Sequence, residues 1–226
     1  MDRLSLPSAL LFDLDGTLVD TAPDLARATN ALRAHHGLSA LPYPRIRSQV
    51  SNGGSALVEM ALGLGREQAG HESARQYLLD RYSEALAVES LVFTPLETLL
   101  QHWIMAGRPW GIVTNKPRAY AAPLVRALEL EPDVLLCADD LPMKKPDPAP
   151  LHEAARRLDV ASEKCWYIGD HHRDVQAARA AGMIAVAVGY GYLEAPDDHR
   201  HWSADFCFDT PEALVHALTK APTDIA

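Results

Sequence analysis

The sequence predicts an α/β fold, a doubly wound (Rossmann-like) parallel-sheet core with an inserted α-helical cap domain. From Val92 onward, apolar segments of strand length alternate with helical patterns of about 10 residues, an order that implies parallel strands and right-handed crossovers. Another apolar run, Ala9–Phe12, stands near the N-terminus, and the segment between the two has helical patterns only. We therefore expect residues 1–20 and 91–226 to form the core and residues 21–90 to form the cap.

The first apolar run ends in a pair of acidic residues. Asp13 and Asp15 are two residues apart, so strand alternation would point both carboxylates the same way, and Gly16 then permits a sharp turn. Two converging carboxylates call for a partner, and a divalent cation with oxygen ligands is the usual one. A plain turn after a core strand remains an alternative. A calcium-binding EF-hand loop is excluded, because that loop needs Gly at its sixth position and Glu at its twelfth, where this sequence has Leu18 and Asp24.

The remaining elements follow from periodicity. In the predicted cap, Thr21 can cap the first helix and Pro23 suits its first turn. Cap helices are expected at 21–36 and 67–88, and between them, after Gly54, a helix that contains Leu57, Met60, Ala61 and Leu64. In the core, strands are expected at 110–114, 134–138, 165–169, 184–188 and 206–208, and helices at 96–106, 119–130, 148–158, 174–181 and 211–218. Ligands bind outside the carboxyl ends of such strands.

Polar residues at these ends are candidates for a phosphate site. Thr114 and Asn115 can donate hydrogen bonds to a phosphate oxygen, although such a pair also commonly caps the next helix. Lys145 stands before Pro146 in a Pro-rich loop, which would hold its ammonium in place rather than on a mobile surface helix.

A second acidic motif follows the apolar segment 165–169. Asp170 is placed to ligate a cation, while Asp174 could join it, hold the lysine, or favour the amino end of the next helix. His171 and His172 suggest zinc, but adjacent imidazoles point apart and no partner has zinc-site spacing.

Composition narrows the class of function. The net charge of −9 argues against binding nucleic acid or an anionic membrane through bulk charge. No apolar run approaches the roughly 20 residues of a membrane span, and the N-terminus lacks a signal-peptide pattern. The three cysteines are widely spaced, which predicts buried, reduced thiols. We expect a cytoplasmic protein without nucleic-acid or membrane partners, either a monomer or a homodimer.

Taken in order, these motifs resemble those of the haloacid dehalogenase superfamily. The segments 12–21 and 113–117 are similar to the phosphoglycolate phosphatase branch. Within it, the segment 110–114, Val50-Ser51 and the Gly-Tyr-Gly-Tyr segment at 189–192 resemble the N-acetylmuramic acid 6-phosphate phosphatases.

The resemblance implies magnesium-dependent hydrolysis of a phosphate monoester. Asp13 would attack phosphorus to give an aspartyl-phosphate, and Asp15 would act as general acid and then general base. Thr114, Asn115 and Lys145 would hold the phosphoryl oxygens. The implied magnesium ligands are Asp13, Asp15 through its backbone carbonyl, Asp170 and Asp174.

The same residues weigh against some relatives. Haloacid dehalogenases need no leaving-group acid, so Asp15 argues against that chemistry. Phosphonatases use a cap lysine, and no lysine precedes Lys116. A sugar phosphomutase keeps both aspartates and stays open, as does a non-catalytic phosphate-binding relative.

Substrate choice is expected to lie with the cap. Arg45 and Arg47, near Asn52 and Gly53, are candidates for binding a substrate carboxylate, because arginine can do so bidentately. Surface arginines beside a loop are an equally good interpretation. The expected substrate is a small carboxylated phosphometabolite, 2-phosphoglycolate or N-acetylmuramic acid 6-phosphate, both of which carry a carboxylate. Arg47, Asn52 and Gly53 complete the predicted substrate site.

Overall fold

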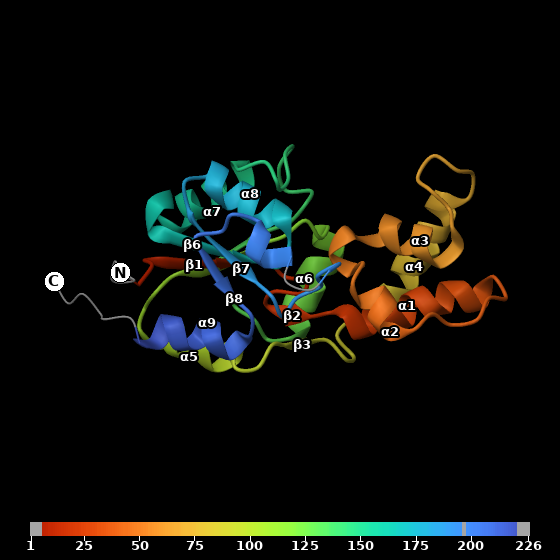
Figure 1. Cartoon of the computed structure of the whole chain (residues 1–226), viewed down its shortest axis with the longest axis horizontal. Coiled ribbons are helices and arrows are strands. Elements are labelled where there is room, and N and C mark those ends of the chain that lie inside the picture. The colour runs from red at the N-terminus through yellow and green to blue at the C-terminus, as the bar shows by residue number, and fades with distance from the viewer. Residues whose placement is uncertain (1–5, 196–197, 221–226) are drawn as a thin grey trace.

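A parallel sheet of six strands forms the core of the computed structural model, which describes residues 6–195 and 198–220 (Figure 1). The strand order is β5-β4-β1-β6-β7-β8, so the first strand of the chain lies in the middle of the sheet. The strands are β1 (Ala9–Phe12), β4 (Trp110–Val113), β5 (Val134–Leu136), β6 (Cys165–Gly169), β7 (Ile184–Val188) and β8 (Phe206–Phe208). The chain crosses from one side of β1 to the other after β5, which confirms the doubly wound fold.

Helices cover both faces of the sheet (Figure 1). In β1, Leu10 and Phe12 pack on one face, while Ala9 and Leu11 pack on the other. All four are buried, which explains why the strand is apolar throughout. The first face is covered by α5 (Leu96–Met105), α6 (Arg118–Ala127) and α9 (Pro211–Lys220), the second by α7 (Ala149–Leu158) and α8 (His172–Ala180).

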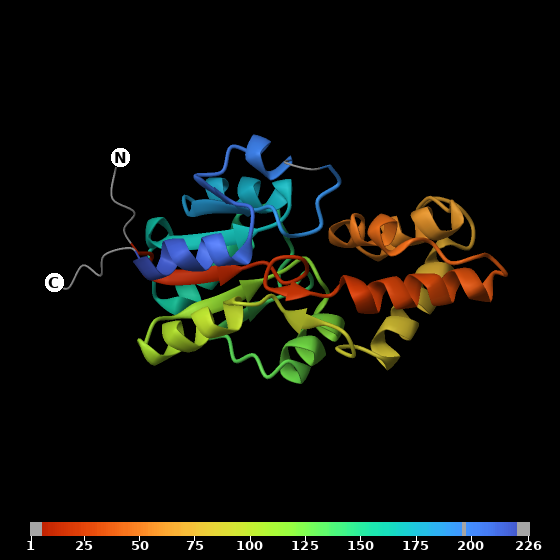
Figure 2. The same cartoon turned by 60° about the horizontal axis from the view of Figure 1, so that its bottom comes forward.

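Four helices form a separate body beside the sheet (Figures 1 and 2), and we refer to it as the cap. They are α1 (Ala22–His35), α2 (Tyr43–Arg47), α3 (Gly54–Leu62) and α4 (His71–Glu84). Leu32, Leu57 and Leu78 are fully buried in its own apolar core. The chain passes between the two bodies through β2 (Val19–Asp20) and β3 (Leu91–Val92), which pair antiparallel. We propose the domain limits at this pair.

Asp24 ties the two connecting segments together. Its buried carboxylate accepts hydrogen bonds from the backbone N–H groups of Val88, Glu89 and Ser90 at 2.9–3.2 Å, and from the Ser90 hydroxyl at 2.6 Å. Burial raises the pKa of this carboxyl, but the hydrogen bonds from Ser90, Arg27 and Glu89 outweigh burial and lower it. The start of α1 is thereby fixed to the segment that returns to the core.

Some local predictions were wrong. The strands β2 and β3 were missed because two residues show no periodicity, and α2 was missed in a Pro-rich segment. Helix α4 begins at His71 rather than at residue 67, because Gly70 precedes it in a left-handed conformation. Cys137 and Cys165 are buried free thiols, but Cys207 is exposed because it lies on the edge strand β8.

No helix of the described residues is long and apolar enough to cross a membrane.

Candidate active site

The strand register explains why motifs far apart in the sequence meet. Phe12, the last residue of β1, is in register with the penultimate residues of β4 and β6. The residues that follow, Asp13 after β1, Thr114 after β4 and Asp170 after β6, therefore lie at one edge of the sheet. This edge faces the cap (Figure 1).

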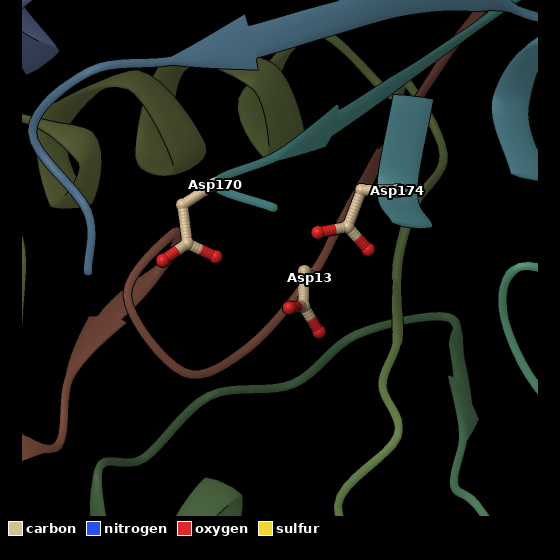
Figure 3. Close-up of side chains that lie close together, drawn as sticks. All are labelled: Asp13, Asp170 and Asp174. Carbon is tan, nitrogen blue, oxygen red and sulfur yellow. The ribbon is translucent and has the colours of Figure 1, made fainter. Parts of the chain in front are cut away.

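Three carboxylates converge at this edge. Asp13, Asp170 and Asp174 each offer an oxygen within 4.8 Å of the others, and Figure 3 shows the three side chains around a common space. Burial raises the pKa of Asp13, and burial together with Asp13 and Asp174 raises the pKa of Asp170 to about 7. Asp13 Oδ1 is buried and has no hydrogen-bond partner among the described residues. Three carboxylates that converge on one space fit a hard divalent cation.

Lys145 supplies the positive charge beside this cluster. Its buried ammonium Nζ lies 2.9 Å from Asp13 Oδ1 without hydrogen-bond geometry, and it donates to Asp174 Oδ1 at 2.8 Å and to the Tyr167 hydroxyl at 2.6 Å. Burial lowers the pKa of the ammonium, but the two carboxylates outweigh burial and raise it. Lys145 is therefore a buried cation held between the two acids.

Asn115 contributes by holding the lysine loop. Its side-chain amide donates to the Lys145 carbonyl at 2.8 Å and accepts from the Lys145 N–H at 3.1 Å. The amide thus fixes the lysine backbone, a role that the sequence did not suggest. Thr114 is buried beside it, and its hydroxyl accepts from the N–H of Lys116 at 3.1 Å.

Asp174 has three donors of its own. Besides Lys145 and Tyr167, it accepts from the N–H of His171 at 3.1 Å as part of a capping box that begins α8. The His171 ring completes this box by accepting from the N–H of Arg173. Asp174 therefore both holds the lysine and caps the helix, two of the three roles that the sequence allowed.

Asp15 is held by a lysine that sequence reasoning left without a role. Its Oδ1 accepts from Lys116 Nζ at 2.8 Å and from the Thr21 hydroxyl at 2.5 Å. The Lys116 ammonium also lies 4.7 Å from the centre of the Tyr82 ring of the cap. The signal available in the sequence was the place of Lys116 directly after Thr114 and Asn115.

Asp170 is enclosed by close backbone approaches and by the cap. Gly16 has φ +80°, and a Cβ there would lie 2.2 Å from Asp170 Oδ2, so only glycine fits the turn. The same oxygen accepts from the N–H of Tyr192 at 2.8 Å and from the hydroxyl of Ser51, in the cap, at 3.1 Å. Thr17 donates to the other oxygen at 3.2 Å.

Arg47 does not line the cavity next to the acids. Its guanidinium donates to the carbonyls of Gly191 at 2.7 Å and Tyr190 at 2.8 Å, and lies 4.8 Å from the centre of the Tyr192 ring. The structure therefore places Arg47 as a contact between cap and core, where it donates to two core carbonyls. Arg45 lies at a separate hollow on the cap.

A cavity of about 630 Å³ opens between core and cap in front of Asp13. Asn52 and Gly53 line it, together with Asp15, Thr114, Asn115 and Lys145. Among its lining side chains six are cationic, namely Arg66, Arg75, Lys116, Lys144, Lys145 and Arg173, and three are acidic, namely Asp13, Asp15 and Glu72. A basic cavity in a protein of net charge −9 indicates an anionic ligand.

Comparison with known proteins agrees with this geometry. Residues 7–182 match the family of haloacid dehalogenase-like hydrolases, and the chain belongs to that family. An N-acetylmuramic acid 6-phosphate phosphatase of Pseudomonas aeruginosa is 42% identical, over 99% of this chain and 100% of its own. A phosphoglycolate phosphatase of Xanthomonas campestris is 39% identical, over 93% and 96% of the two chains.

Solved structures show the same fold. A predicted phosphoglycolate phosphatase from Haemophilus somnus has a TM-score of 0.82 at 24% identity, covering 96% of this chain and 100% of its own. A haloacid dehalogenase-like hydrolase from Streptococcus pneumoniae has a TM-score of 0.78 at 24% identity, covering 92% and 96%. Within its family the chain is a phosphatase that resembles phosphoglycolate and N-acetylmuramic acid 6-phosphate phosphatases.

Proposed function

We propose that the protein is a magnesium-dependent phosphomonoesterase that works through an aspartyl-phosphate. The observation that carries the proposal is the Asp13 carboxylate, which lies beside the Lys145 ammonium and two further carboxylates at the inner end of a basic cavity. A substrate phosphate in the cavity would meet the nucleophile and its charge-stabilising partner together.

The residues divide the reaction between them. Asp13 attacks phosphorus, which splits one hard displacement into two steps. Asp15 protonates the departing alkoxide and then takes a proton from the attacking water. Thr114 and Lys145 bind phosphoryl oxygens, while Asn115 fixes the lysine loop and also faces the cavity.

The acidic cluster fits magnesium. We propose Asp13, the backbone carbonyl of Asp15, and Asp170 as protein ligands, with Asp174 completing the acidic set. When bound, magnesium would offset the repulsion between an anionic nucleophile and a phosphate dianion.

The proposed substrate is a small carboxylated phosphate ester. Relatives that act on phosphoglycolate and on N-acetylmuramic acid 6-phosphate have similar identities to this chain, 39% and 42%, so identity does not decide between the two. The cavity of about 630 Å³ is large for a small ligand. A two-carbon ester would leave most of that space unfilled, which favours the amino sugar. The free thiols of Cys137 and Cys165 support a cytoplasmic location.

The test is a direct comparison of kcat/KM for 2-phosphoglycolate and N-acetylmuramic acid 6-phosphate, with magnesium, in one assay. A preference above about a hundredfold corresponds to about 2.7 kcal/mol of differential transition-state binding and would name the substrate. Feeble and equal rates on both would contradict the carboxylated substrate class. Transfer of phosphate within a hexose phosphate would instead favour a phosphomutase.

A further inference from the structure

The cavity extends well beyond the phosphate end. Along α4 its lining residues are His71, Glu72, Arg75, Leu79 and Tyr82. Tyr82 covers Lys116 at the core end. At about 1.5 Å per residue, Arg75 lies about 10 Å and His71 about 16 Å farther along the helix axis. The cavity therefore has a distant wall that a phosphate group bound at Asp13 does not reach.

That wall contains a buried polar atom without a partner. His71 is only 4% exposed, and its Nε2 has no hydrogen-bond partner among the described residues. Buried ring nitrogens are normally satisfied, so an unsatisfied one that lines a cavity points to a ligand. A protonated or neutral imidazole can donate a hydrogen bond to an anionic oxygen.

Two arginines, Arg66 and Arg75, also line the cavity. Arg66, in the loop between α3 and α4, is exposed and makes no hydrogen bond or ion pair with any described residue. Arg75 is paired with the exposed Glu72 at 3.0 Å, and its Nε would lie 3.9 Å from a Cβ placed at Gly54. The second guanidinium thus lies near Gly54, the residue after Asn52 and Gly53, which the sequence predicted for substrate binding. Guanidinium groups bind carboxylates well because their donors match the two oxygens.

We propose that Arg66, His71 and Arg75 form a second anion-binding site, which takes the carboxylate of a phosphate ester whose two anionic groups are held apart by a ring-sized spacer. The inference rests on the proposed function, since it places the phosphate at Asp13. A two-carbon phosphate ester is too short to occupy both ends at once. This assignment replaces Arg47, which does not line the cavity and donates to two core carbonyls.

The experiment compares three substrates with magnesium: N-acetylmuramic acid 6-phosphate, N-acetylglucosamine 6-phosphate, which lacks the carboxylate, and p-nitrophenyl phosphate. Arg66→Met, His71→Ala and Arg75→Met should each lower kcat/KM for the carboxylated sugar by about tenfold or more, as expected when a charge-assisted contact is lost. The other two substrates should change by less than about twofold. Arg81→Met is the matched control, because Arg81 lies on the same helix, pairs with Glu84 and does not line the cavity.

The outcomes separate the two proposals. Equal losses on all three substrates, or no loss on any, would overturn the second anion site. A wild-type protein that hydrolyses no phosphate ester with magnesium would overturn the proposed function instead. Arg66 is exposed and unpaired among the described residues, so Arg66→Met keeps the test valid even if His71→Ala does not fold.

Discussion

The hydroxyl of Ser51 in the cap lies 3.1 Å from Oδ2 of Asp170 in the core. A cap side chain therefore touches one of the proposed magnesium ligands. Two neighbouring contacts hold the same arrangement: Arg47 donates to the carbonyls of Tyr190 and Gly191, and Asn52 donates to Glu194 at 2.6 Å. The segment 47–52 of the cap thus contacts both the core and one proposed magnesium ligand.

Ser51→Ala should weaken magnesium binding. The substitution removes one of the donors that orient Asp170, and loss of such an outer partner typically costs about tenfold or more in metal affinity. The measurement is the magnesium concentration that gives half-maximal hydrolysis of p-nitrophenyl phosphate. Ser48→Ala is the control, since its hydroxyl bonds only to the nearby Arg45 carbonyl. An unchanged magnesium requirement in Ser51→Ala would refute this role of Ser51.

The metal-free protein should lose stability as the pH rises from about 4 to 7. Burial and neighbouring carboxylates raise the pKa of Asp170 from 3.8 to about 7, so the folded state binds more protons than the unfolded state in this window. The free energy of unfolding then falls with pH, by at most about 1.4 kcal/mol per pH unit from this group. Urea unfolding in EDTA across this range measures the slope, and Asp170→Asn should flatten it.

Magnesium should restore stability at neutral pH. Magnesium at about 100 times its dissociation constant should add about 2.7 kcal/mol to the free energy of unfolding. The gain should be absent in Asp170→Asn, which removes a proposed ligand. Thermal unfolding with and without magnesium measures it, and a full gain in the variant would exclude Asp170 as a ligand.

Asp24→Asn should destabilise the protein by about 2 kcal/mol at pH 7, because the charged carboxylate loses several hydrogen bonds at the junction of cap and core. These hydrogen bonds lower the pKa of Asp24 in the folded protein. The ionised carboxylate therefore adds to the free energy of unfolding above pH 3.8, the ordinary pKa, and this stabilisation is lost as the pH falls through the folded-state pKa. Urea unfolding should give a difference from wild type that shrinks toward acid pH. Asp80→Asn, on an exposed part of α4, should cost less than about 0.5 kcal/mol. A difference that stays constant with pH would contradict this role.

The sequence predicted which core residues meet at the edge of the sheet, but not which cap residues face them, and the difference has a physical reason. Asp13, Lys145 and Asp170 follow strands or stand in a rigid loop, so the order of elements alone brings them to one edge. The position of Lys116 under Tyr82 and the unpartnered nitrogen of His71 depend on how α4 is rotated and docked. No local pattern in the sequence reports that orientation.

The contacts of Arg47 could not be predicted from the local sequence either. Arginines beside a Gly-rich loop are compatible with substrate binding, and only the folded chain reveals that core carbonyls take up this guanidinium. The fold class, by contrast, is confirmed because alternating strands and helices leave few other topologies.

The most direct test of the account is hydrolysis of p-nitrophenyl phosphate by wild type and by Asp13→Asn, with and without magnesium. The substitution preserves the shape of the side chain but removes its nucleophilic charge. We expect magnesium-dependent release of p-nitrophenol by the wild type and none by the variant, with both proteins folded. Magnesium-dependent turnover that survives in Asp13→Asn would show that Asp13 is not the nucleophile.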